Sequence, residues 1–421
     1  MKRFLLPIFL IALAAPASAD VFRILDDPRE AAQARVDIIQ QAEHDVSALY
    51  FLARNDRITL GALTLLRDAR RRGVRVRLVV DANFQHIPKA MLAHLRDEGV
   101  EVRVYHPLSL RHPSWLFRRM HDKVIVVDGR RYITGGRNLA EAYFGLAKKN
   151  YIDRDVYVEG ESGAVAQRHF ERVWGSHHVA ELDVHVSEAE EQLAAQKLDE
   201  AHDFAECLPF VQLDTDRDWS HGQKEVSAVK FLSDPIDDGP RVATALAIII
   251  ERAKKSIVVE SPYLVPSRQV RRLLRKKLKE GVSVLILTNS LRSTDGSFPH
   301  AGYVKYRRRL VRAGVDVREY KGPHMLHAKS AVIDGRIALI GSYNLDPRSQ
   351  NLNTEIMCMV EDEQIAGELR DSIQLHIDNS WTIYADGSRD GAPGDPRVSH
   401  AKVIRAWLVQ HLLLRLIERQ L

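Results

Sequence analysis

The chain has 421 residues, of which 45% are hydrophobic and 28% are charged, and its formal net charge is +5. This composition is typical of a globular protein and excludes a disordered chain and a multi-pass membrane protein. The length is sufficient for two domains, and the mild basic excess suits an anionic partner, either phospholipid or nucleic acid.

Residues 1–19 have the features of a signal peptide. Lys2 and Arg3 form a basic start, residues 4–15 are apolar, and residues 17–19 are small, as at a cleavage site. The apolar run is too short to span a bilayer comfortably. We therefore expect an exported protein, periplasmic or secreted and able to associate with a membrane, with an uncleaved anchor as the alternative.

The first part of the mature chain alternates between helical and strand patterns. Asp27 and Pro28 form a helix-start signal, and apolar residues recur at helical spacing up to about residue 42. Further patterns follow in the order strand, helix, strand, helix, strand, at 46–52, 60–72, 74–80, 89–97 and 100–105. This alternation predicts an α/β/α arrangement around a mostly parallel sheet.

The same pattern returns in the second half. Strand, helix, strand, helix and strand are expected at 257–260, 268–279, 282–288, 303–312 and 315–320. The segment 99–105 matches 314–320, so the chain reads as a duplicated unit. The predicted divisions are a signal peptide at 1–19, an N-terminal lobe at 20–180, a connection at 181–238, a C-terminal lobe at 239–385, and a turn region with an amphipathic helix at 386–421.

The chain has two cysteines, Cys207 and Cys358. An oxidising compartment permits a disulfide between them. Cys358 lies in an apolar segment that reads as a buried strand, so two separate buried thiols are the favoured interpretation.

One motif occurs in both halves at identical spacing. Its members are His121, Lys123, Asp128, Gly135 and Asn138 in the first copy, and His327, Lys329, Asp334, Gly341 and Asn344 in the second. In each copy Asp-Gly forms a hairpin-turn signal after an apolar segment. The glycines near the end of the motif are expected to let backbone approach a ligand closely.

The residue types suit a phosphodiester. His and Lys two residues apart on a strand face the same way, so each copy presents both together. The lysines neutralise the non-bridging oxygens, and Asn138 and Asn344 add neutral donors. One neutral imidazole can attack phosphorus while one imidazolium protonates the leaving alkoxide. Neither a metal nor another cofactor is expected, because the lysines supply the positive charge and no Mg²⁺- or Ca²⁺-binding carboxylate loop is recognisable.

The motif His-x-Lys-x4-Asp-x6-Gly-[Gly/Ser]-x-Asn, present twice, resembles that of the phospholipase D superfamily. Flanking segments are similar to bacterial cardiolipin synthases, especially the C type. They lie at 118–121, 135–139, 142–145, 287–291, 300–303 and 346–349. The resemblance covers residues from about 46 to 361.

The resemblance implies two lobes related by pseudo-twofold symmetry that share one active site. It further implies phosphatidyl transfer or hydrolysis on glycerophospholipids through a phosphohistidine, with His121 as nucleophile and His327 as acid and base. Glu355 stands where the family has a histidine-orienting carboxylate, and Asp155 is the expected equivalent in the first copy. In the family the aspartates of the motif, here Asp128 and Asp334, mostly brace it.

The sequence also bears on two other functions and on a membrane contact. A nuclease of the same superfamily is less favoured, because no basic stripe interleaved with aromatic residues is present. An inactive scaffold is disfavoured because both motif copies are intact.

Residues 112–119 combine Trp115, Leu116 and Phe117 with arginines, which suits either a bilayer surface or ordinary packing. The terminal helix, 403–421, is expected to dock on its own domain or to lie on a membrane. The sequence leaves the oligomeric state open.

Overall fold

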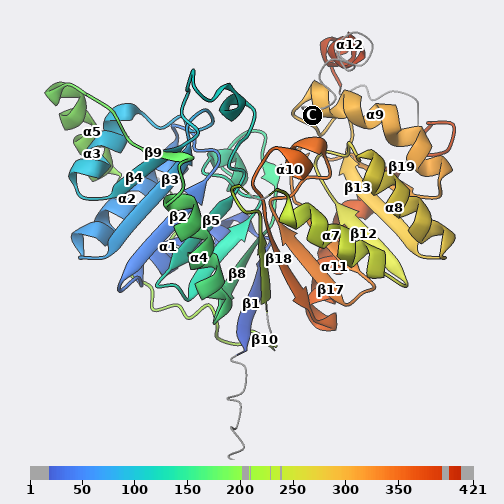
Figure 1. Cartoon of the computed structure of the whole chain (residues 1–421), viewed down its shortest axis with the longest axis horizontal. Helices are drawn as coiled ribbons and strands as arrows, with labels where there is room; N and C mark the ends of the chain where they lie inside the picture. Colours follow the sequence, from blue (N-terminus) through green and yellow to red (C-terminus); the bar gives the residue numbers. More distant parts are fainter. Residues whose placement is uncertain are drawn as a thin grey trace, which may run out of the picture.

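The structure, a computed structural model, describes residues 19–201, 208, 210–227, 229–237, 239–390 and 398–408. Two α/β lobes lie side by side, the first drawn in blue to green and the second in yellow to red (Figure 1). This confirms the expected fold class. The predicted signal peptide up to residue 18, Cys207 and the end of the predicted terminal helix lie outside the described residues.

The first lobe is built on a nine-stranded sheet of order β10-β1-β8-β6-β5-β2-β3-β4-β9. Its strands are β1 (Asp20–Leu25), β2 (Asp45–Tyr50), β3 (Arg75–Asp81), β4 (Glu101–Tyr105), β5 (Lys123–Val127), β6 (Arg131–Gly135), β8 (Asp155–Glu159), β9 (Val179–Glu181) and β10 (Glu225–Val226). Its helices are α1 (Pro28–Gln40), α2 (Arg57–Arg71), α3 (Lys89–Asp97), α4 (Ser162–Trp174) and α5 (Glu188–Glu200).

The second lobe is built on an eight-stranded sheet of order β11-β18-β17-β16-β12-β13-β14-β19. Its strands are β11 (Val229–Ser233), β12 (Ser256–Glu260), β13 (Ser283–Asn289), β14 (Asp316–Tyr320), β16 (Ser330–Ile333), β17 (Ile337–Gly341), β18 (Ile356–Glu361) and β19 (Ser380–Thr382). Its helices are α7 (Arg241–Arg252), α8 (Arg268–Lys279), α9 (Ser297–Arg312), α10 (Pro347–Asn351), α11 (Glu363–Asp378) and α12 (His400–Leu408).

From β1 to β9 in one lobe and from β11 to β19 in the other, eight strands follow the same order, which confirms the duplication. The sheets are mixed rather than mostly parallel. Only β2, β3 and β4, and likewise β12, β13 and β14, pair in parallel, whereas the strands around each Asp-Gly hairpin pair antiparallel. A hairpin turn must reverse the chain, so each motif adds antiparallel strands to a parallel core.

Asp128 and Asp334 fix the equivalence of the two lobes residue by residue. Both occupy the turn of their hairpin at positive φ, 52° and 56°. The Asp128 carboxylate accepts the backbone N–H groups of residues 43–45, and that of Asp334 accepts those of residues 254–256. Residue 45 therefore corresponds to residue 256. Both aspartates brace the start of a strand, β2 or β12, and are not placed among the reacting groups.

The predicted connection is part of both lobes rather than a separate linker. Its strands β10 and β11 extend the first and the second sheet, respectively. Helix α5 packs on α2, where Leu198 O accepts a hydrogen bond from Thr64 Oγ1. Further along, Trp219 Nε1 donates to Asp37 Oδ2 at 2.8 Å and so covers the outer side of α1.

One hydrophobic core joins the two lobes. It contains Phe22 and Phe170 of the first lobe together with Ile340 and Ile373 of the second, all at most 1% exposed. Buried Arg154 adds a polar link, because it donates to Glu260 Oε2 at 2.6 Å across the boundary. Burial of each large apolar side chain contributes about 1.5–3 kcal/mol, so the shared core holds the two motif copies in a fixed relation. Among the described residues, no helix is long and apolar enough to cross a bilayer.

Candidate active site

Each motif histidine is held by backbone of the opposite lobe. The N–H of His121 donates to Thr354 O at 3.1 Å, beside an isolated bridge between Met120 and Thr354. In the other copy, β15 (Met325–Leu326) pairs with β7 (Tyr151–Ile152), and the N–H of His327 donates to Ile152 O at 2.7 Å. The two halves therefore exchange short strand contacts that bring both motifs to one boundary.

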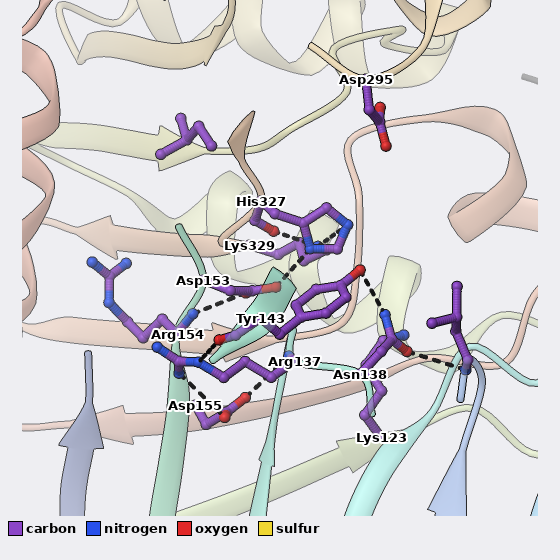
Figure 2. A network of polar contacts seen from close by, with 12 residues as sticks. Lys123, Arg137, Asn138, Tyr143, Asp153, Arg154, Asp155, Asp295, His327 and Lys329 are labelled. Carbon is purple, nitrogen blue, oxygen red and sulfur yellow. Dashed lines mark hydrogen bonds and ion pairs between the residues drawn. The ribbon is translucent and has the colours of Figure 1, made fainter. Parts of the chain in front are cut away.

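The carboxylates that meet the histidines also cross between the lobes. Glu355 Oε2 lies 2.9 Å from His121 Nδ1, and Asp153 Oδ2 lies 2.6 Å from His327 Nδ1. Figure 2 shows Asp153 next to His327 and Lys329. A carboxylate on Nδ1 fixes the tautomer and turns Nε2 toward the substrate. Glu355 thus contacts a histidine as expected, but that of the other copy.

The expected role of Asp155 is wrong, and Asp153 takes its place. Strand pairing sets Gly135 opposite Asp155 and Gly341 opposite Met357, so Asp155 corresponds to Met357 and Asp153 to Glu355. In the sequence Asp155 and Glu355 each precede an apolar run, but Asp155 is already the first residue of β8 and lies two residues beyond the counterpart of Glu355.

Asp155 has a different task. Its carboxylate accepts from Arg35 Nη2 at 2.8 Å and from Arg137 Nη1 at 3.2 Å. All three side chains are buried. They form a structural network within the first lobe, of which Figure 2 shows Arg137 and Asp155.

The motif glycines make room for the neighbouring strand rather than for a ligand. A Cβ on Gly136 would collide with Asp153 Oδ1, and one on Gly341 would collide with Ile356 O. Ser342 occupies the position of Gly136 in the second copy, and its hydroxyl donates to Glu355. Asp153 thus packs directly against Gly136, whereas Glu355 accepts a hydrogen bond from the Ser342 hydroxyl.

The motif lysines are buried beside the histidines. Lys123 is 2% exposed and donates to His121 O at 2.6 Å, and Lys329 is 1% exposed and donates to His327 O. Burial lowers the pKa of Lys123 to about 7 and also lowers that of Lys329. A phosphodiester anion would stabilise the charged form of both.

The predicted phosphate-binding role of the asparagines is only partly matched by their contacts. Asn138 is engaged by protein: its Oδ1 accepts from Leu52 N at 3.2 Å and its Nδ2 donates to Tyr143 Oη at 2.9 Å. Asn344 Oδ1 is buried and meets no hydrogen-bond partner among the described residues. Phosphate contact by either residue remains a prediction.

Aromatic rings surround the histidines, which the sequence analysis did not foresee. The Phe51 ring lies 4.9 Å from that of His121, edge-on, and the rings of Tyr143 and Tyr151 lie 5.3 and 5.2 Å from that of His327. Tyr143 falls in the family-like segment 142–145, which was the available signal. These rings exclude water from the site, which strengthens its electrostatic interactions.

The surroundings shift the pKa values of the two carboxylates in opposite directions. Burial raises the pKa of Glu355 to about 8, despite the attraction of Lys123. Burial acts on Asp153 in the same direction, but Lys329 and His327 outweigh it and hold the pKa of Asp153 well below its usual range. Burial and the nearby lysines also lower the pKa values of His121 and His327.

A group of side chains that could hold a metal ion lies apart from the motif histidines in the described part of the chain. His177, His178 and Asp237 form a group with closely spaced ligand atoms, within which His178 Nε2 hydrogen-bonds Asp237 Oδ1 at 2.8 Å. His177 and Asp237 are exposed, and buried His178 meets His106 through Nδ1 and Nε2, so this group connects to His106 rather than to the motif histidines.

Comparison with known proteins identifies the family. A family profile described as "Cardiolipin synthase, PLD-like domain" matches residues 36–174 and 246–377. The chain belongs to this family. Cardiolipin synthase C of Escherichia coli (strain K12) is similar to it, with 31% identity over 417 residues that cover 86% of each chain. Cardiolipin synthase 1 of Bacillus anthracis is 28% identical over 357 residues, covering 82% of this chain and 64% of the relative.

A solved structure supports the fold. Phosphatidylserine synthase of Haemophilus influenzae Rd KW20 overlies 95% of this chain and 95% of its own, with a TM-score of 0.70 at 16% identity. At this identity the likeness shows the fold alone. Together with the family match, it confirms the expected phospholipase D superfamily, its two-lobed architecture and an enzyme of the phosphatidyltransferase type.

Proposed function

We propose that this enzyme transfers a phosphatidyl group from a glycerophospholipid to an alcohol through a phosphohistidine, as in cardiolipin synthesis, and that it hydrolyses the lipid when water is the acceptor. The crossed pairing of His121 with Glu355 and of His327 with Asp153 supports this proposal most strongly. It presents two oriented imidazoles beside two buried lysines, which is the arrangement that an in-line displacement at phosphorus requires.

In the first step, His121 Nε2 attacks phosphorus and the P–O bond to the leaving alcohol breaks. His327 Nε2–H gives its proton to the departing alkoxide. In the second step, neutral His327 removes the proton from the acceptor hydroxyl, whose oxygen attacks phosphorus and releases His121. Lys123 and Lys329 balance the charge of the non-bridging oxygens throughout.

The different charges of the carboxylates support this division of labour. Burial and Lys329 lower the pKa of His327, and ionised Asp153 acts against them, so it favours the imidazolium that a general acid needs. Glu355 has a raised pKa, and its Oε1 meets no partner among the described residues. A proton on Oε1 leaves Oε2 able to accept from His121 Nδ1–H, so His121 stays neutral and its Nε2 remains nucleophilic.

The test offers purified protein two phosphodiesters, phosphatidylglycerol vesicles and plasmid DNA, with and without added glycerol. We expect lipid products that shift from phosphatidic acid toward transfer products when the alcohol is added, as measured by lipid mass spectrometry. The His121→Ala variant, shown to be folded by circular dichroism, should lack this activity. Cleavage of DNA alone, or full lipid turnover by the variant, would overturn the proposal.

We further propose that the protein is exported and meets the membrane through residues 107–119. In this segment Leu108 is 80% exposed and Leu110 is fully exposed, and Leu116 and Phe117 are 51% and 43% exposed. Exposed apolar side chains close to arginines suit an anionic bilayer surface. Replacing both Leu108 and Leu110 by Ser should weaken co-flotation with anionic vesicles, and fractionation of cells should place the protein outside the cytoplasm.

A further inference from the structure

The second lobe contains an apolar cavity that begins at the catalytic motif. It has a volume of about 150 Å³ and lies between the sheet and helices α7 and α8. Apolar side chains line most of it, among them Leu246, Ala247, Leu273 and Met357, and Lys329 and Tyr343 also contribute to its wall. Lys329 directly precedes β16 and lies two residues from Ala331, so both face the same side and the cavity reaches the motif lysine.

This cavity adjoins a surface groove. The groove, of about 510 Å³, lies between α7 and α8 and shares Thr244, Ala247, Gln269 and Leu273 with the cavity. Arg252, Arg272 and Lys276 lie along the groove, together with Glu251, which pairs with Lys276. The motif lysine, the apolar cavity and a groove with a net positive lining therefore follow one another.

The first lobe fills the corresponding space with polar side chains. By the equivalence that Asp128 and Asp334 establish, Arg35 corresponds to Leu246 and Tyr50 to Ser261. Arg35 Nε lies 3.3 Å from Tyr50 Oη, and Arg35 Nη2 lies 2.8 Å from Asp155, whose own counterpart is Met357. The counterpart cavity measures only about 50 Å³.

The helices over the two spaces, α1 and α7, also differ in how much of their outer face is covered. In α1, nine residues are buried, and Gln33 and Asp37 bond to the segment 212–219 that packs over the helix. In α7, only Val242 is buried, and Ile248 is 48% exposed. Within the part of the chain that the structure describes, the second lobe thus has neither the charged filling nor the cover of this space, although the motif lies at its end.

We propose that this cavity binds one acyl chain of the glycerophospholipid whose phosphate lies at Lys329. The proposal rests on the proposed function and specifies a substrate subsite for it. A dry apolar cavity of about 150 Å³ accommodates a molecule the size of benzene, or about six carbons of a chain. A longer chain would continue into the groove between α7 and α8, where the aliphatic stems of Arg252, Arg272 and Lys276 can flank it.

The first test uses the unaltered enzyme and soluble substrates below their micelle concentrations. We expect kcat/KM for dibutanoyl, dihexanoyl and dioctanoyl phosphatidylglycerol to rise by roughly three- to fourfold per methylene group until about six carbons are buried, and more slowly thereafter. Activity that does not depend on chain length would overturn the acyl site while leaving the proposed function intact. Absence of all lipid activity would instead overturn the proposed function.

The second test fills the cavity with the large side chain of Ala247→Phe. The matched control is Ala247→Ser, whose side chain is close in volume to that of alanine. We expect Ala247→Phe to lower kcat/KM for dioctanoyl phosphatidylglycerol at least tenfold, and to leave hydrolysis of bis(4-nitrophenyl) phosphate, which has no acyl chain, within twofold. Equal activity of both variants on the long-chain lipid would contradict the proposal. If Ala247→Phe does not fold, Ala247→Leu supplies a smaller filling, and the chain-length series on the unaltered enzyme decides the question by itself.

Discussion

The two halves of the active site have the same motif but different surroundings. His327 meets Asp153, which Lys329 and Arg137 keep ionised, whereas His121 meets Glu355, whose pKa is raised to about 8. Buried Asp234 accepts from the backbone N–H of Glu355 at 3.1 Å, and the nearby Asp122 carboxylate adds to the raised pKa of Glu355. The two motif histidines therefore lie in unlike surroundings, which supports the different roles that we propose for them.

The largest expected effect is the loss of turnover when either histidine is replaced, and substrates with different leaving groups distinguish the two variants. His121→Ala should abolish turnover of every phosphodiester, a loss of about 10⁴-fold or more, because no covalent intermediate forms. His327→Ala should be equally poor with lipid. With bis(4-nitrophenyl) phosphate it should still release one equivalent of nitrophenolate, because this leaving group needs no proton.

Rapid-quench measurement of nitrophenolate, together with mass spectrometry of the protein, checks this prediction. A burst and a phosphorylated His121 are expected in the His327→Ala variant. A burst in the His121→Ala variant instead would exchange the two roles, because the phosphoryl group would then reside on His327.

Replacing Asp153 should lower kcat more than replacing Glu355. Asp153→Asn removes an ionised partner of the general acid, so kcat should fall by about 10²–10⁴-fold. Glu355→Gln replaces a group that carries a proton near neutral pH, so kcat should fall by only about tenfold. Steady-state kinetics with phosphatidylglycerol at neutral pH compares them, and equal losses would mean that the two halves carry the same charge.

Much of this arrangement could be predicted from the sequence. The spacing of His121, Lys123 and Asp128 and their repeats indicated the duplicated lobes and the shared site, because these positions are set by one strand and one hairpin turn. The crossing of the carboxylates could not be predicted, because Asp153 and Glu355 reach the opposite histidines only through contacts between lobes. The cavity under Lys329 was also hidden, since it depends on Leu246 and Met357 replacing a charged network at positions distant in the chain.

The pH dependence of stability provides a smaller test. Because the pKa of Glu355 is about 8 in the folded protein and near 4.5 when unfolded, the folded state holds this proton more tightly. Glu355 therefore stabilises the fold most below pH 4.5, and this contribution is lost as the pH rises toward 8. His121 and Lys123, with lowered pKa values, act in the opposite direction.

Comparison with Glu355→Gln isolates the contribution of Glu355. The free energy of unfolding, measured by urea denaturation near pH 5 and near pH 8, should fall more over this interval in the unaltered protein than in the variant. An identical pH dependence in both proteins would show that Glu355 is already ionised near pH 5.

The smallest effect concerns the two residues that the lobes use alike. Asp128 and Asp334 each accept hydrogen bonds from three successive backbone N–H groups at the start of β2 or β12. Asp128→Ala and Asp334→Ala should each lower the free energy of unfolding by about 1–3 kcal/mol, because loop amides lose their acceptor. The kcat of the protein that remains folded should stay within a few-fold of the unaltered value in both variants. A loss of kcat comparable to that of His121→Ala, with stability retained, would mean that these carboxylates take part in the reaction. Similar small losses of stability in both variants would instead mean that the two halves differ only in the groups around the histidines.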